Sequence, residues 1–193
     1  MTSSSITRWY ECLLLDQHKI KISDGLGYKS NHCIVVYNVY ASYLNFGPGW
    51  MGKMKNLKVL QLGRWMSRIF ELPPSIIKIK YLETLDLKAC HNLETLPSDI
   101  SSLRNLQKLD LSQCYLLDRM PKGIENLTLL RVLKGFVLGS SSKTRCKISD
   151  VATNLIYLRK LSIRIGSGAV IQDGEFESLK VLSELEHLKI SWG

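Results

Sequence analysis

The sequence lacks the features that mark secreted, membrane-spanning and zinc-binding proteins. Its five cysteines are odd in number and form no C-x-x-C pair, so neither a disulfide framework nor a zinc site is indicated. A membrane-spanning helix needs about 18 apolar residues in a row, and no apolar run in the chain comes close to that length. The first residues also have no apolar stretch like that of a secretory signal. These absences predict a cytoplasmic protein with no membrane span.

Catalytic signatures are also scarce. The four histidines show no metal-ligand spacing, and no G-x-S-x-G element or Cys–His grouping is present. Residues 47–53 satisfy G-x-x-x-x-G-K, the pattern of a phosphate-binding loop. However, Met54 stands where a Ser or Thr should hold magnesium, and the residues that follow predict a strand instead of a helix. We therefore expect a non-catalytic protein with no cofactor and no metal.

What the chain has instead is an internal repeat. The segment Leu82–Cys90 matches Leu106–Cys114, 24 residues later, in the pattern L-x-x-L-x-L-x-x-C. Such a period is typical of leucine-rich repeats, in which each coil of a solenoid buries its apolar face against its neighbours. The register extends in both directions to six coils, although Gly135 replaces a leucine in the fourth. Their strand residues are Leu57, Leu60 and Leu62; Leu82, Leu85 and Leu87; Leu106, Leu109 and Leu111; Leu130 and Leu133; Leu158, Leu161 and Ile163; and Leu185, Leu188 and Ile190.

These coils predict an α/β fold, a leucine-rich-repeat solenoid. A curved parallel sheet should form its concave face, with short helical or 3-10 turns and loops on its convex face. Residues 46–193 form the repeat domain, with a polar insertion at 139–147, and residues 1–45 form an irregular lead-in. The lead-in has a strand at His18–Ile22 and room for one degenerate repeat at Ile34–Val39. Because no polar cap follows the last strand, we expect the chain to be a piece of a larger protein.

The residues between the strand leucines should face the concave surface, because side chains alternate along a strand. Asp86 and Asp110 then align one coil apart, at about 5 Å, and on an open sheet we interpret them as ligand contacts instead of catalytic acids.

The net charge is +9, and residues 134–164 carry seven cationic residues against one acidic residue. This is either a solvated face with a basic loop or a docking surface for an acidic partner; a nucleic-acid partner is not expected, because no binding motif accompanies the charge. The candidate partner-binding residues are Thr84, Asp86, Lys88, Lys108, Asp110, Lys134, Phe136, Lys160, Arg164, His187 and Lys189.

Several segments resemble one family of repeat proteins. Leu96–Leu111 and Leu72–Ile76 are similar to repeats of the plant intracellular nucleotide-binding leucine-rich-repeat disease-resistance proteins. Met120–Ile124, then Leu133–Phe136, a polar insertion and Leu158–Ile163, follow an order that resembles the coiled-coil class of these receptors. Gly135 is part of this resemblance.

The resemblance implies a sensor and autoinhibitory module of innate immunity. In that family the repeats hold the receptor's nucleotide-binding domain in its ADP form and release it when a pathogen effector or an effector-modified host protein is engaged. The implied partners are the family's own nucleotide-binding domain, an effector or a host kinase-like adaptor. The chain has no coiled coil, no true phosphate loop and no MHD-type motif, so nucleotide switching cannot lie in it. An autonomous intracellular scaffold of the plant Ras-group-related type is the alternative, and an enzyme-inhibitor solenoid is a third.

Overall fold

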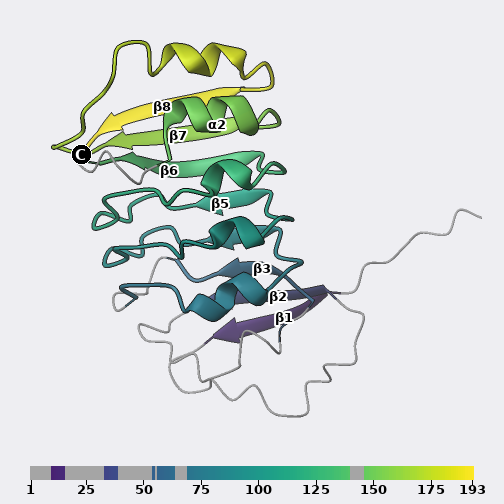
Figure 1. Ribbon diagram of the computed structural model, residues 1–193. Coiled ribbons are helices and arrows are strands. Elements are labelled where there is room, and N and C mark those ends of the chain that lie inside the picture. Colours follow the sequence, from purple (N-terminus) through teal and green to yellow (C-terminus); the bar gives the residue numbers. More distant parts are fainter. Residues whose placement is uncertain (1–9, 16–32, 39–53, 55, 64–68, 140–145) are drawn as a thin grey trace, which may run out of the picture.

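The computed structural model describes residues 10–15, 33–38, 54, 56–63, 69–139 and 146–193. In this part of the chain, eight parallel strands form one sheet, and their order in space follows their order in the sequence (Figure 1). This arrangement confirms the leucine-rich-repeat solenoid. The strands are β1 (Tyr10–Leu15), β2 (Cys33–Asn38), β3 (Leu57–Gln61), β4 (Thr84–Asp86), β5 (Lys108–Asp110), β6 (Val132–Leu138), β7 (Lys160–Ile165) and β8 (His187–Trp192).

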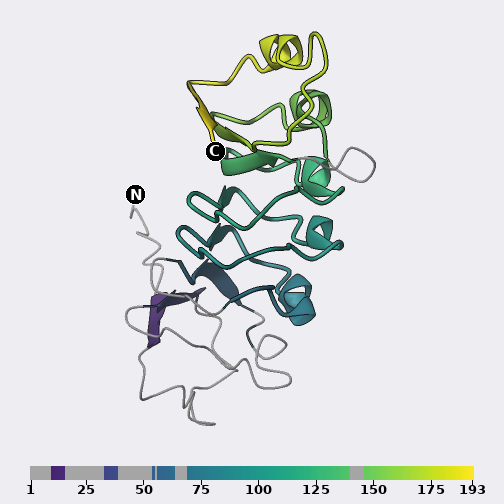
Figure 2. The ribbon, with the colours of Figure 1, turned by 90° about the vertical axis from the view of Figure 1, so that its left-hand side faces the viewer.

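Short helices stack in a second layer behind the sheet, as Figure 2 shows from the side. The L-P-x-x-I motif explains the first two, because proline fixes the backbone angle φ for a tight turn. The amide of Ile76 donates to the carbonyl of Pro73 at 2.9 Å, and that of Ile100 donates to Pro97 at 3.2 Å. The helical segments are η1 (Pro74–Lys78), η2 (Ile100–Ser102), η3 (Ile124–Asn126), α2 (Ile148–Asn154) and η4 (Glu177–Val181).

The core is one ladder of leucine and isoleucine that runs between the two layers. The central strand leucines of β3, β4, β5 and β6 are fully buried. The isoleucines of the convex helices η1, η2 and η3, Ile76, Ile100 and Ile124, are fully buried as well. Each strand leucine stacks on its counterpart, since Leu60 pairs with Leu85 and Leu85 with Leu109. One coil therefore completes the core of the next.

The last strand shows the same pattern without cover on one side. Leu188 and Ile190 of β8 pair in register with Leu161 and Ile163 of β7. The two β7 residues are buried, whereas Leu188 and Ile190 are 47% and 42% exposed. No further coil of the described chain packs on them.

The N-terminal part of the sheet differs from the sequence-based expectation. β1 lies at Tyr10–Leu15, where the repeat pattern predicts no strand, and it pairs with β2 along six residues. β2 overlaps the degenerate repeat expected at Ile34–Val39. The strand expected at His18–Ile22 lies outside the described residues.

β6 contains a bulge at Gly135. Leu133 pairs with Leu161, but the next core pair is Phe136 with Ile163, so β6 holds one residue more than β7 over this span. Gly135 absorbs the extra residue with a positive φ of 73°, which favours glycine. The shift places Phe136, 1% exposed, in the core position of the missing leucine. The prediction that Phe136 lies on the concave surface is therefore wrong.

Candidate functional site

The exposed face of the sheet brings most candidate residues into columns. The first column consists of residues that pair in register from strand to strand, namely Thr84, Lys108, Val132, Lys160 and His187. In the second column, Asp86 pairs with Asp110, and Asp110 pairs with Lys134. Beyond the bulge, Ser162 pairs with Lys189. Phe136 leaves the surface, and Asp110, at 4% exposure, is also buried.

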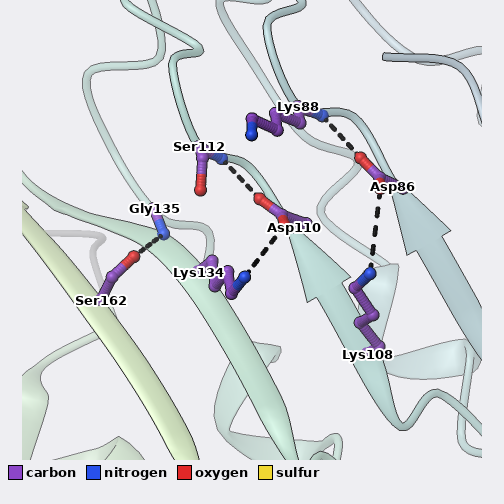
Figure 3. Close-up of polar contacts among 8 residues, drawn as sticks. All are labelled: Asp86, Lys88, Lys108, Asp110, Ser112, Lys134, Gly135 and Ser162. Carbon is purple, nitrogen blue, oxygen red and sulfur yellow. Dashed lines mark hydrogen bonds and ion pairs between the residues drawn. The ribbon is translucent and has the colours of Figure 1, made fainter. Parts of the chain in front are cut away.

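Asp86 and Asp110 make the same two contacts, one coil apart (Figure 3). One oxygen of Asp86 accepts a hydrogen bond from the Lys88 amide at 3.0 Å, and its other oxygen lies 3.9 Å from the Lys108 ammonium. Asp110 accepts from the Ser112 amide at 3.1 Å and lies 3.8 Å from the Lys134 ammonium.

These contacts give the two aspartates a structural role. A side chain that accepts the amide two residues ahead fixes the turn at the end of the strand. In both coils that turn continues into a residue with positive φ, Ala89 at 62° and Gln113 at 65°. The Asp86 and Asp110 side chains are only 17% and 6% exposed, and each is paired with a lysine of the next coil. Both carboxylates are thus already engaged by contacts within the solenoid.

The lysines of the last two strands are in a different situation. Lys160 on β7 and Lys189 on β8 are exposed. Within the described part of the chain, neither ammonium has a carboxylate at ion-pair distance. His187, between them on the surface, lies 3.9 Å from Glu186. Lys88, after β4, also has no carboxylate at ion-pair distance among the described residues, but two neighbouring uncompensated lysines occur together on β7 and β8.

A groove of about 800 Å³ covers this cationic part of the face. It extends from the loop after β5 to the end of β8, and no Asp or Glu side chain is among its lining residues. Gln113 and Tyr115 line it from the β5 loop, and the ring of Tyr115 stacks on His91 at 5.3 Å between centroids. Its charged and polar side chains from the strands include Lys134, Lys160, Ser162, Arg164, His187, Lys189 and Ser191.

Arg164 holds the groove together instead of presenting its charge to solvent. Its guanidinium donates to the carbonyl oxygens of Cys114 at 3.2 Å and Leu117 at 2.5 Å, both in the loop after β5. The side chain thus connects β7 to a coil two positions away. Val137, which pairs with Arg164 on β6, is buried at 2% exposure. These contacts predict that charge reversal at Arg164 disturbs the fold.

Arg164→Glu should destabilise the protein much more than Lys160→Glu. The substitution removes two hydrogen bonds from a charged donor and places a carboxylate beside two carbonyl oxygens, at a cost of about 3 kcal/mol. Lys160 makes no such contact, so its reversal should cost less than about 0.5 kcal/mol. Urea denaturation followed by circular dichroism measures both. Equal midpoints for the two variants would rule out the structural role of Arg164.

The cysteine positions of the repeat are structural as well. The Cys114 thiol donates to the carbonyl of Leu87 in the preceding coil at 3.2 Å. Burial raises the pKa of both Cys90 and Cys114 to about 12, so these groups remain neutral thiols at physiological pH. Burial also raises the pKa of Cys146. These thiols fill space in the core, and the neutral form that burial favours is a poor nucleophile.

Other chemistry has little support in the described residues. Among them, no group of three His, Cys, Asp or Glu side chains could hold a metal ion. No helix found in them is long and apolar enough to cross a lipid bilayer. Residues 47–53, which resemble a phosphate-binding loop, lie outside the described chain, and Met54 is buried at 2% exposure.

The stacked parallel coils and their buried leucine ladder define a leucine-rich-repeat protein. A family model for the leucine-rich repeat region matches residues 42–193, so the chain belongs to this family. The chain is also similar to "Disease resistance RPP13-like protein 4" of Arabidopsis thaliana, with 37% identity over 144 residues. This match confirms the resemblance to disease-resistance proteins. It covers 75% of this chain but 14% of the relative, so the chain spans a small part of the relative's length.

Proposed function

We propose that this chain is the recognition and autoinhibitory repeat module of a plant innate immune receptor in the cytoplasm. It senses a pathogen effector or an effector-modified host protein through the concave face, and it restrains the receptor's nucleotide-binding domain until that partner is engaged. The similarity to a disease-resistance protein carries this proposal.

The structure of the concave face supports a binding role over a catalytic one. The face is an open sheet whose aspartates are already engaged by backbone amides and lysines. The thiols of Cys90, Cys114 and Cys146 are buried, and burial raises their pKa, so they are protonated. What the face offers to a partner is a rigid row of polar side chains at fixed spacing, which suits recognition of a protein surface.

Restraint of the nucleotide-binding domain can be tested in plant leaves. Co-expression of this chain with a coiled-coil-class receptor that lacks its own repeats should suppress the cell death caused by that receptor, because the module would favour the closed state. The two proteins should also co-precipitate, and less so as ionic strength rises. The Leu109→Asp chain, whose core is disrupted, is the negative control. An autonomous scaffold would neither suppress cell death nor bind, and that result with a folded chain would reject the proposal.

A further inference from the structure

The concave face has a largely neutralised half, in which Lys88 is the exception among the candidate lysines, and a cationic half. From β3 to β6 the carboxylates are paired across neighbouring coils: Glu83 with Lys58, Asp86 with Lys108, and Asp110 with Lys134. On β7 and β8 the surface lysines have no such partners among the described residues. A division of this kind gives the face a definite electrostatic polarity.

We propose that the groove over β6, β7 and β8 binds an extended acidic segment of a partner protein, whose carboxylates pair with Lys160 and Lys189. The inference rests on the proposed function in one respect, namely that the concave face docks a protein. It adds the chemistry of the docked segment and the two side chains that recognise it.

The spacing of the two lysines fits an extended chain. Lys160 pairs with His187, and Lys189 lies two residues further along β8, so the two lysines are diagonal neighbours on adjacent strands. Diagonal neighbours on a sheet lie about 7–8 Å apart. An extended peptide places side chains on the same side every two residues, about 7 Å apart. Two acidic residues separated by one position can therefore face both lysines at once.

Three other polar side chains of the groove are already engaged, whereas Lys160 and Lys189 have no carboxylate at ion-pair distance in the described chain. Ser162 accepts a hydrogen bond from the Gly135 amide at 2.7 Å (Figure 3). Arg164 donates to two carbonyl oxygens, and Lys134 lies beside Asp110. Because no Asp or Glu lines the groove, no acidic side chain within it competes with an incoming one.

The test is direct binding of short synthetic peptides, measured by fluorescence anisotropy with the folded chain. One fluorescein-labelled peptide alternates Glu with Ser, and a second has Gln in place of each Glu. A single-stranded DNA oligomer of similar length is the third probe. The protein variants are Lys160→Glu with Lys189→Glu, and a control with Lys78→Glu and Lys122→Glu. The control changes the net charge equally, at exposed lysines in or beside the convex helices.

The Glu peptide should bind the natural chain, and the Gln peptide should bind at least about tenfold more weakly. The groove variant should lose about tenfold in affinity for the Glu peptide, whereas the control should lose less than about threefold, because exposed charges far from the ligand are screened. Equal losses in the two variants would overturn the proposal, since net charge alone would then explain binding. Tighter binding of the DNA oligomer, with the same sensitivity to the groove variant, would also overturn it.

The two proposals fail separately. If the natural chain suppresses receptor cell death but does not distinguish the Glu peptide from the Gln peptide, the acidic-segment inference is wrong and the proposed function stands. If it binds the Glu peptide through Lys160 and Lys189 but neither binds nor restrains the receptor, the proposed restraint of the receptor is wrong and the acidic-segment inference stands.

Discussion

Leu109→Asp is expected to unfold the repeat array. Leu109 is fully buried and lies in register between Leu85 and Leu133, so the new carboxylate would be enclosed by the leucine ladder on both sides. The loss of apolar packing and the burial of an unpaired charge together should cost at least about 4 kcal/mol. Far-UV circular dichroism during urea denaturation measures the effect.

The matched control for that experiment is Gln107→Asp, two residues earlier in the same coil. Gln107 is exposed, and its backbone makes hydrogen bonds with Glu83 and Arg131, so replacement of its side chain should change the free energy of unfolding by less than about 0.5 kcal/mol. Denaturation curves of Leu109→Asp and Gln107→Asp that coincide would show that the register of β5 is wrong.

Gly135→Ala is expected to be nearly as damaging, although it adds a single methyl group. A Cβ at this position would lie 2.5 Å from the carbonyl carbon and oxygen of Leu111 and 2.8 Å from the Ser112 amide nitrogen. These are backbone atoms of the neighbouring coil, so they can move only if the strands separate. Together with the positive φ of 73°, this contact should cost about 3 kcal/mol or more.

Gly174 offers a matched control for the backbone angle alone. It has a similar φ of 77°, but a Cβ there would meet no atom within 4 Å. Gly174→Ala should therefore cost about 1 kcal/mol, which is the price of the left-handed conformation by itself. The difference between the two melting temperatures measures the close approach of β6 to the β5 coil. If the two alanine variants melt together, that approach is not rigid.

The repeat pattern predicts the solenoid well because one rule governs both sequence and structure. A leucine at a strand position must be buried between coils, and Leu60, Leu85, Leu109 and Leu133 are all fully buried as the spacing predicts. The same rule does not predict β1, because residues Tyr10–Leu15 do not carry the L-x-x-L-x-L spacing.

The candidate site was predictable in position but not in role. The alternation of side chains places Asp86, Asp110 and Lys160 in their columns correctly. A glycine inside a strand is a known sign of a bulge, and that sign at Gly135 could have shown that the next residue turns into the core. The contacts of Arg164 with Cys114 and Leu117 span about two coils, and no local pattern could have indicated them.

Alternation along each strand separates two kinds of evolutionary change. Substitutions at the buried positions alter the framework, whereas those at the outward positions alter specificity and leave the framework in place. Asp86, Asp110 and Arg164 blur this separation, because they point outward and yet hold turns and loops. In descendants of this gene, new specificities should therefore arise mainly at outward positions such as Thr84, Lys160 and Lys189, which can vary without loss of a coil.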